Sequence, residues 1–429
     1  GMQSRVERRN YWVFLLEGGM FYFGVGFVNA QIFLPAVIFK EGGPVWLVAF
    51  VPSLMAVGAF GVPILTAGFI DRLPRMKPFS LVTGFLQRFV YVIAGLIFVF
   101  AAPSQSWVVW ILALTPLLSG ILGGVGLTAW QRLYIKGVPP GWRASNIAYR
   151  FMFGGITGIL AGLLIERVLS VYPGTLGYGY LHLLAAACLM GSWINLCFVK
   201  EPEDAPDDSE PAPRQGILAT IQHFYREGPD QRSRICFTAA VLLMHSFLLM
   251  PPFYAIFLLD RLGQSPSYLG VLAMWQMGGQ ATGNLFAAFV GDRWGGRATL
   301  GFGFCVLSAA CVVGLFVDTP MQAQLAYAFF GLSQMLAIVG KDTLVMELTP
   351  KKLQAGYLSL VALVTMVSLL SVGMLSQFLW TRGGLSALAL TTVGLCFLGF
   401  LSLSWVKDPR AKQLPTLRAI RHGFLRFMR

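Results

Sequence analysis

Long apolar runs separated by short polar stretches dominate this 429-residue sequence. Each run holds about 18–25 residues, the length that a helix rising 1.5 Å per residue needs to cross roughly 30 Å of hydrocarbon. The runs lie near residues 11–38, 45–67, 79–101, 107–130, 146–170, 178–199, 235–259, 267–290, 298–317, 321–345, 355–380 and 385–406. The pattern predicts an all-α membrane protein with twelve transmembrane helices.

Two polar motifs recur half a chain apart and mark an internal repeat. AGFIDRLPRMK (67–77) and AAFVGDRWGGR (287–297) each lie in a short gap between two long apolar runs. VPPGWRASN (138–146) and LTPKKLQAG (348–356) each follow a fourth run and precede a fifth. Together the two pairs predict two pseudo-symmetric six-helix bundles that point the same way across the membrane.

The segments between and after the two bundles differ from the apolar runs in composition and periodicity. Residues 200–216 are acidic and Pro-rich and lack apolar periodicity, which is typical of a flexible linker, and residues 217–225 predict a short surface helix. Residues 416–429 favour an amphipathic helix on an anionic membrane surface, with a disordered basic tail as the alternative. The predicted organisation is an N-terminal six-helix half at 1–199, a cytoplasmic linker at 200–233, a C-terminal six-helix half at 234–406 and a basic amphipathic tail at 407–429.

The repeated loop motif also indicates a family. Asp71-Arg72-x-x-Arg75 and Asp292-Arg293-x-Gly295-x-Arg297 resemble the loop 2–3 and loop 8–9 signature of the major facilitator superfamily. The resemblance covers almost the whole chain, because both copies are in register with the twelve runs. The N-terminal residues through the first loop motif also resemble a group of bacterial facilitator proteins.

The chain departs from the family signature at three positions. The leading Gly of the motif is Ala67 and Ala288 here, and Pro74 replaces the Gly that follows the first Asp-Arg. The resemblance nevertheless implies a secondary transporter that works by alternating access, with its site between the two halves near the middle of the membrane.

The resemblance implies gating roles for the charged residues of both loops. In relatives, the loop 2–3 Asp lies near the N-terminus of helix 11, where an anion is stabilised by roughly 0.3–1 kcal/mol, and its basic neighbours bind nearby acidic groups. Carried over, Asp71 would face residues 353–357 and Asp292 would face residues 144–147. Such an energy tilts a two-state equilibrium without locking it. The gating candidates are Asp71, Arg72, Arg75, Asp292, Arg293 and Arg297.

Composition and charge exclude several other classes of protein. Hydrophobic residues make up 56% and charged residues 12% of the chain, whereas soluble domains hold about 45–50% and about 25%. The formal net charge is +13, but the basic residues lie in loops on the side of the N-terminus rather than in a nucleic-acid-binding domain. By the positive-inside rule that side is cytoplasmic, so we expect a multi-pass protein of the cell (inner) membrane with both termini in the cytoplasm. The six cysteines have no disulfide or metal-ligand spacing.

Few ionisable residues lie deep in the apolar runs. At mid-helix each costs about 2.5–3.5 kcal/mol on insertion scales, so it needs a partner or a function. Glu17 lies in the first run, Arg88 in the third and Arg150 in the fifth. The family implies that the first helix lines the central cavity, where a partly desolvated Glu17 would suit proton coupling. The alternative is a static ion pair of Glu17 with Arg88 or Arg150.

Uncharged polar side chains form the second candidate group. Gln276, Gln280 and Asn284 recur at four-residue steps in the eighth run, and Gln31 follows Glu17, Phe21, Gly24 and Val28 on one predicted stripe of the first. Amides can face a wet cavity and hydrogen-bond many solutes, whereas hydrogen bonds between helices, worth about 0.6 kcal/mol each, are the alternative. For the histidine, satisfied packing is the alternative. The predicted substrate-binding residues are Asn29, Gln31, His245, Gln276, Gln280, Asn284 and Gln334.

These observations favour transport of a small organic solute. No pair of cationic side chains lies unambiguously deep in the predicted cavity, and aromatic and Met residues are abundant, so we expect a neutral or amphipathic solute with proton coupling. Gly154, Gly158 and Gly162 form a small-residue face that resembles the antiporter motif of the family without its Pro. The fourth run also lacks the Arg of drug–proton antiporters, which argues against drug efflux.

Two other functions stay open at this point: a lipid or lysolipid flippase on the same scaffold, and a substrate sensor without flux. An enzyme is not expected, because the sequence has no H-E-x-x-H, P-loop, G-x-S-x-G or paired Cys motif. We expect no cofactor and no metal. The expected partners are a small-molecule substrate, a proton or other coupling ion and membrane lipids, with no nucleic acid, and we expect a monomer.

Overall fold

The computed structural model describes residues 4–70, 72–203, 217–226, 230–348 and 354–409, and every element in these ranges is helical. The first half contains α1 (Arg5–Gly26), α2 (Phe33–Lys40), α3 (Val45–Phe50), η1 (Val51–Ser53), α4 (Leu54–Gly61), α5 (Pro63–Ile70), α6 (Lys77–Leu96), η2 (Ile97–Ala101), α7 (Gln105–Gly137), α8 (Pro140–Val171) and α9 (Thr175–Cys197). After α10 (Ile217–Arg226), the second half contains α11 (Gln231–Met244), η3 (His245–Leu248), α12 (Pro251–Arg261), α13 (Tyr268–Leu315), α14 (Pro320–Leu348) and α15 (Gln354–Ser404).

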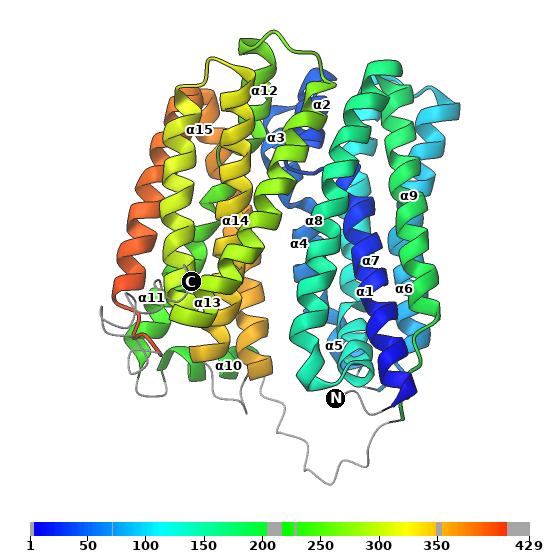
Figure 1. Cartoon of the computed structure of the whole chain (residues 1–429), viewed down its shortest axis with the longest axis vertical. Helices are drawn as coiled ribbons and strands as arrows, with labels where there is room; N and C mark the ends of the chain where they lie inside the picture. The colour runs from blue at the N-terminus through cyan, green and yellow to red at the C-terminus, as the bar shows by residue number, and fades with distance from the viewer. Residues whose placement is uncertain (1–3, 71, 204–216, 227–229, 349–353, 410–429) are drawn as a thin grey trace, which may run out of the picture.

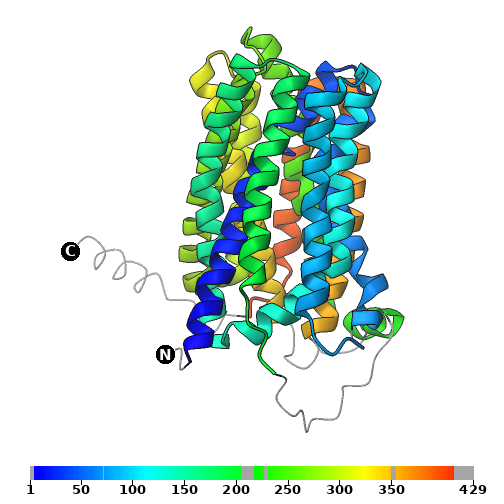
Figure 2. The ribbon, with the colours of Figure 1, turned by 90° about the vertical axis from the view of Figure 1, so that its right-hand side faces the viewer.

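The helices stand side by side in two groups, one for each half of the sequence (Figure 1). Turned by 90°, the bundle still shows its long helices running along one axis, with the start of the chain at one end (Figure 2). We call this end the N-terminal face and the other end the opposite face. The helix α10 confirms the short helix predicted between the halves. Residues 204–216 and 227–229 of the predicted linker and residues 410–429 of the predicted tail lie outside the described residues.

Two very long helices each make two passes because a glycine bends them sharply. The backbone of Gly295 in α13 has φ 83° and ψ 179°, and that of Gly384 in α15 has φ 61° and ψ −150°. Residues that carry a Cβ rarely adopt a positive φ, so glycine is the residue that permits these sharp bends. Eight described helices are long and apolar enough to cross a membrane. With α13 and α15 divided, and with the segmented first and second passes added, the helices are consistent with twelve crossings.

The first pass of each half is interrupted near its middle, which corrects the prediction of one continuous first helix. α1 ends at Gly26 and α2 begins at Phe33, so Val28 and Gln31 do not continue the helical stripe that begins at Glu17. The Asn29 Oδ1 atom accepts hydrogen bonds from the backbone N–H groups of Gln31 and Ile32 at the break. These bonds satisfy backbone donors that the broken helix leaves free.

The seventh pass has an interruption at the equivalent place. The 3₁₀ segment η3 follows α11, and α12 then begins with Pro251 and Pro252, which have no backbone N–H to contribute to a preceding helical turn. Broken helices at corresponding positions of two repeats are a feature of substrate sites in secondary transporters. Apolar periodicity alone does not reveal such a break, because the residues on both sides of it are equally apolar.

The two halves approach each other most closely toward the opposite face. A Cβ built on Gly162 of α8 would lie 2.7 Å from the carbonyl oxygen of Gly270 in α13, so the two backbones are in contact there. One built on Gly158 would meet only the Met277 side chain, at 3.0 Å, and one on Gly155 would be 3.3 Å from the Ala281 Cβ. The spacing between α8 and α13 therefore widens toward the N-terminal face.

The hydrophobic core is divided into a large cluster shared by the two halves and a small cluster on the N-terminal face. The larger core cluster crosses from one half to the other and includes Phe33 of α2 and Phe253 of α12. A smaller cluster, which includes Tyr11, Phe14 and Leu133, belongs to the N-terminal face of the first half alone. In the described part of the chain, the first half thus closes its N-terminal face on its own side chains, whereas the larger core is shared by the two halves.

Candidate functional site

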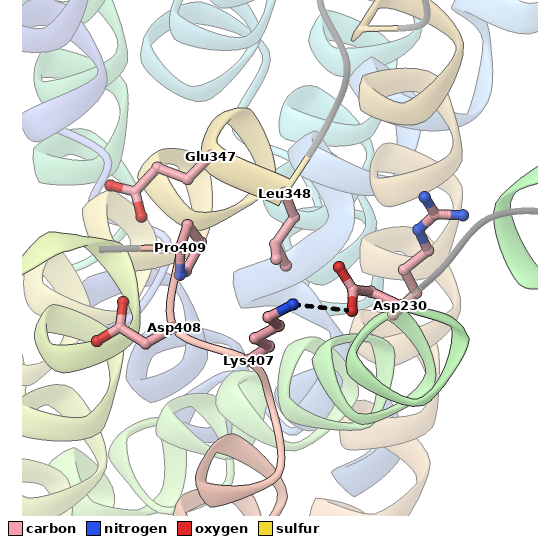
Figure 3. A pocket seen from close by; sticks show the side chains of 7 residues that line it. Asp230, Glu347, Leu348, Lys407, Asp408 and Pro409 are labelled. Atoms are coloured by element: carbon pink, nitrogen blue, oxygen red, sulfur yellow. Dashed lines mark ion pairs between the residues drawn. The ribbon is translucent and has the colours of Figure 1, made fainter. Parts of the chain in front are cut away.

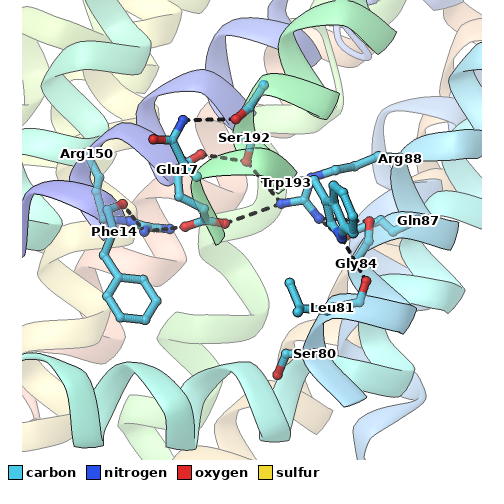
Figure 4. Close-up of polar contacts among 12 residues, drawn as sticks. Phe14, Glu17, Ser80, Leu81, Gly84, Gln87, Arg88, Arg150, Ser192 and Trp193 are labelled. Atoms are coloured by element: carbon cyan, nitrogen blue, oxygen red, sulfur yellow. Dashed lines mark hydrogen bonds and ion pairs between the residues drawn. The ribbon is translucent and has the colours of Figure 1, made fainter. Parts of the chain in front are cut away.

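A buried ion cluster joins three helices of the first half. Glu17 of α1 accepts a hydrogen bond from Arg150 Nη1 of α8 at 2.6 Å and one from Arg88 Nη2 of α6 at 3.3 Å. The two guanidinium groups lie on either side of the carboxylate (Figure 4). Glu17 and Arg88 are each 3% exposed and Arg150 is 8% exposed. The structure therefore pairs Glu17 with both arginines that the sequence offered as alternatives.

Backbone groups and one hydroxyl hold the cluster in place. Arg150 Nη1 also donates to the Phe14 carbonyl at 2.6 Å, and Arg88 Nη1 donates to the Gly84 carbonyl at 2.9 Å. Ser192 of α9 accepts from Arg88 Nη2 at 3.0 Å and donates to the Glu17 carbonyl at 2.7 Å. Sequence reasoning missed Ser192, because a single serine in an apolar helix is more often bonded within its own turn.

Aromatic side chains surround the arginines. The Arg150 Cζ atom lies 4.9 Å from the ring centre of Trp130 and 5.9 Å from that of Tyr134, and Arg88 Cζ lies 5.3 Å from that of Phe21. At these distances the ring faces attract the cations, more strongly in a dry site than in water. Trp130 and Tyr134, both on α7, were not among the predicted site residues.

Amide side chains form a second cluster, and part of it bridges the halves. Gln276 of α13 donates through Nε2 to Gln31 Oε1 at 2.6 Å and accepts a long bond of 3.4 Å from Asn29 Nδ2. Gln280 donates to Gln334 Oε1 of α14 at 2.9 Å, which is a contact within the second half. Gln276 and Gln280, which are four residues apart on α13, therefore both bond to amides of other segments.

Two predicted binding residues lie apart from this pattern. Asn284 is partly exposed and forms no side-chain hydrogen bond with another residue that the structure describes. His245 is 4% exposed, and its Nδ1 lies 2.9 Å from the Val241 carbonyl oxygen. Since a carbonyl only accepts, Nδ1 must carry the proton in this contact. The packed and hydrogen-bonded state of His245 is the one that the sequence offered as the alternative to substrate binding.

The gating candidates lie on the N-terminal face. Asp71 lies outside the described residues, as do the side chains of residues 353–357 that it was expected to face. Arg72 and Asp292 are exposed, and the Arg293 Cζ atom lies 3.6 Å from the ring centre of Phe289. Nothing in the described chain tests the predicted contact between Asp292 and residues 144–147.

The remaining two motif arginines contact acidic residues of their own halves. Arg75 Nε lies 3.9 Å from Glu201 Oε2, and Arg297 Nη1 lies 4.0 Å from Asp408 Oδ2. Both acids directly follow the last helix of their half, in the related segments Phe-Val-Lys-Glu-Pro (198–202) and Trp-Val-Lys-Asp-Pro (405–409). This third repeat in the sequence was missed, although its spacing could have revealed it.

Each of these repeated segments, which we call the exit segments, also binds the first helix of its half. The Lys200 backbone N–H donates to Asn10 Oδ1 at 3.0 Å, and that of Lys407 donates to Ser233 Oγ at 2.7 Å. An arginine next to each acceptor adds a ring contact, because Arg9 lies over Phe198 and Arg232 over Trp405. The exit segments therefore tie the end of each half to its beginning.

Glu201 is the centre of the first exit segment. Burial alone would raise the pKa of its carboxyl, but the backbone N–H groups of Met76 and Lys77 and the Lys136 ammonium together hold that pKa below its ordinary value. The N–H donors lie at 2.8 and 2.9 Å, at the start of α6, and Lys136 Nζ lies at 3.3 Å. A carboxylate at a helix N-terminus also interacts favourably with the helix dipole.

Surface pockets border both exit segments. One of about 380 Å³ is lined by Asp230, Arg234, Glu347, Leu348, Lys407, Asp408 and Pro409. Figure 3 shows it, with Lys407 Nζ directed at Asp230 at 3.7 Å. The other, of about 370 Å³, is lined by Arg75, Lys77, Pro78, Val199, Lys200 and Glu201. Both lie on the N-terminal face, away from the amide cluster.

Comparisons with known proteins support a transporter fold. Residues 235–428 match the family model of the Major Facilitator Superfamily, whereas the sequence matches none of the curated proteins. The chain is similar in structure to the nucleoside transporter NupG, with 14% identity, a TM-score of 0.67 and coverage of 94% of this chain and 100% of that chain. For the human organic anion transporter MFSD10 the identity is 15%, the TM-score is 0.62, and the coverage is 93% and 100%.

The chain is also similar in structure to a bacterial homologue of the iron transporter ferroportin. The inward-facing structure matches with 17% identity and a TM-score of 0.65, covering 94% of this chain and 100% of that chain. The outward-facing structure matches with 16% identity and a TM-score of 0.58, covering 94% and 99%. Residues 235–428 therefore match the Major Facilitator Superfamily by sequence, and the chain as a whole has the fold of the transporters to which it is similar.

Proposed function

We propose that this protein is a secondary transporter that moves a small organic solute by alternating access. One observation carries the proposal: on the N-terminal face each half is tied to itself by its exit segment, while the contact between α8 and α13 tightens toward the opposite face, from Gly155 to Gly162. Two bodies that are internally packed and joined near one end can rock about that contact. The transporter fold of the structural relatives supports the same function.

The positive-inside rule supports an inner-membrane protein with a cytoplasmic N-terminal face. In that orientation the conformation described here opens toward the cytoplasm. The higher TM-score against the inward-facing ferroportin homologue, 0.65 compared with 0.58 for the outward-facing one, agrees with this orientation.

The amide cluster is our candidate for substrate contact. Gln276 is bonded to Gln31 across the halves, next to the break in the first pass, and Gln280 and Gln334 lie beside it. A solute that replaces these hydrogen bonds would act on both halves at once, as a substrate that controls rocking must. Amides provide donors and acceptors without a net charge, which suits the polar part of a neutral or amphipathic solute.

Glu17 is our candidate for proton coupling. Its carboxylate accepts from both arginines, so it can take up a proton only when an ion pair opens. Arg150 lies on α8, which also forms the contact with α13, so a shift of α8 against α1 as the halves rock would draw Arg150 away from Glu17. Proton binding would then be restricted to one conformation, which is the condition for coupling a gradient to transport.

We further propose that Asp71 and Asp292 bias the gate, as the family signature implies. Arg75 and Arg297 would contribute indirectly, by fixing the loops of the signature to the exit segments. An anion at a helix N-terminus contributes roughly 0.3–1 kcal/mol, which is enough to shift the populations of two states.

Spin-label distances on both faces test the rocking motion. In a background without the native cysteines, labels at exposed Arg8 and Gln231 report on the N-terminal face, and labels at exposed Ser104 and Gln264 report on the opposite face. Acidification, or a metabolite mixture selected by thermal shift, should lengthen one distance and shorten the other. Distances on the two faces that change together, or that never change, would exclude alternating access.

A further inference from the structure

The buried charges around Glu17 do not balance. Among the described helical residues of the first half, three charged residues are less than a tenth exposed: Glu17, Arg88 and Arg150. Arginine stays protonated in proteins. One carboxylate therefore faces two guanidinium groups, and the cluster has a net charge of +1.

The other groups around the cluster do not cancel this charge. The carbonyls of Phe14 and Gly84 accept hydrogen bonds from the arginines, and the ring faces of Phe21 and Trp130 lie near them. These are dipoles and quadrupoles, so they reduce the energy of a cation without supplying a negative charge. An uncompensated charge in a low-dielectric interior is costly unless an opposite charge joins it.

Two buried donors next to the arginines also lack an acceptor. Arg88 Nε and Trp130 Nε1 have no hydrogen-bond partner among the residues that the structure describes. Both are N–H groups, so the cluster lacks acceptors as well as negative charge. A single anionic group would supply both, since a carboxylate or phosphate oxygen accepts several N–H bonds.

We propose that this cluster binds one negatively charged group, such as a carboxylate, a phosphate or a halide, next to Arg150 and the indole N–H of Trp130. That end is favoured because the Arg150 side chain is 10% exposed and the Arg88 side chain only 4%. The indole ring of Trp130 is centred 4.9 Å from the guanidinium carbon of Arg150. A bound anion would bring the net charge of the cluster to zero.

Anion binding and proton binding should reinforce each other at this site. A proton on Glu17 removes the only negative charge, so the cluster then has a net charge of +2 and attracts an anion more strongly. By linkage, the anion equally favours the protonated carboxyl. This step rests on the proposed coupling role of Glu17, whereas the anion site itself does not.

Thermal unfolding of the purified protein tests the site. Chloride, formate, inorganic phosphate or benzoate is added at constant ionic strength, with methanesulfonate, which is none of the proposed ligands, as the replaced anion. The melting temperature of the wild type should rise with anion concentration and then level off. Glu17→Gln should half-saturate at a several-fold lower concentration, and Arg88→Gln, which leaves a neutral pair, should lose the anion dependence. Arg167→Gln is the control, because it removes an exposed charge from α8, the helix that carries Arg150.

The outcomes separate the possible sources of the anion. Stabilisation by chloride and phosphate assigns the site to an inorganic ion, and stabilisation by formate or benzoate alone assigns it to the charged group of an organic solute. If Arg88→Gln does not fold, Glu17→Gln still decides. Its half-saturating anion concentration must be lower than that of the wild type and must not depend on pH as that of the wild type does. The same curve for the wild type, Glu17→Gln and Arg167→Gln would overturn the proposal. That result would leave alternating access untouched, because the assay involves no transport.

Discussion

The absence of a side chain at Gly18 leaves room for the buried guanidinium group of Arg150. A Cβ on Gly18 would collide with the guanidinium group of Arg150, and one on Gly19 would collide with the ring of Phe153. α8 can therefore approach α1 closely enough for Arg150 to reach both Glu17 and the Phe14 carbonyl. Apolar pattern does not reveal this, since two adjacent glycines in a membrane helix permit close packing without specifying the partner.

At the same scale, Gln280→Ala separates substrate binding from helix packing. If Gln280 touches the solute, the substitution should weaken affinity by about 1 kcal/mol, roughly fivefold. The melting temperature should change little, because a hydrogen bond such as the one to Gln334 contributes only about 0.6 kcal/mol in a membrane protein. Titration of a ligand found by thermal shift, together with the melting curve, measures both quantities.

Thr282→Ala is a matched control for Gln280→Ala. Thr282 lies on the same helix, is exposed, and its hydroxyl donates only to the Gly278 carbonyl within that helix. A lower melting temperature with unaltered affinity for Gln280→Ala would assign the amide to helix packing.

At the scale of elements, each exit segment joins the end of its half to helices that come earlier in the same half. Glu201 accepts from the first backbone N–H groups of α6 and pairs with Lys136 at the end of α7. The sequence predicted the passes on either side of this point. It could not predict the contact, because helices that are far apart in the sequence meet there only after the bundle has formed.

The pKa of Glu201 predicts how stability depends on pH. A depressed pKa means that the folded state favours the carboxylate, so its contribution is complete above the ordinary carboxyl pKa, about 4.5. It is lost as the pH falls through the lower folded value. Glu201→Gln should therefore have a lower melting temperature than the wild type at neutral pH, and the difference should narrow only below the ordinary value.

Glu203→Gln provides the comparison for this pH series, since Glu203 is an exposed carboxylate two residues away. It should match the wild type throughout. A gap between Glu201→Gln and the wild type that stays constant to the lowest accessible pH would show that the carboxylate charge is not what stabilises the exit segment.

For the whole molecule, the contact between α8 and α13 determines which way the halves tilt. Gly162→Val would place side-chain atoms against the backbone of Gly270 and Met274, where a Cβ alone already lies within 2.7 Å. The halves should separate at this end, so the distance between labels at Ser104 and Gln264 should lengthen. Overpacking of this kind typically costs about 1–3 kcal/mol.

Gly278→Val on α13 serves as the control for this distance measurement, because nothing lies within 4 Å of a Cβ built there. Its label distances should equal those of the parent protein. Equal distances for Gly162→Val as well would mean that the α8–α13 contact does not set the tilt.

The sequence predicted the passes, the repeat and the scarcity of intramembrane charge, because length, periodicity and desolvation cost act locally. The low number of charges also limited the partners of Glu17 to Arg88 and Arg150. The sequence could not show that both arginines bind Glu17 at the same time. Nor could it show that Gln31, which lies after the break in the first pass, bonds to Gln276. Those contacts depend on the angle between the helices, which is set by side chains of many elements together.

The exit segments have a consequence for how the protein is made. Each half is closed by contacts between its first helix and its exit segment, from Asn10 to Lys200 and from Ser233 to Lys407. The closing contacts of the N-terminal bundle therefore need no residue beyond Glu201, and this bundle can close while the ribosome is still translating the second one. The two bundles can thus form one after the other, before the contacts between them are made.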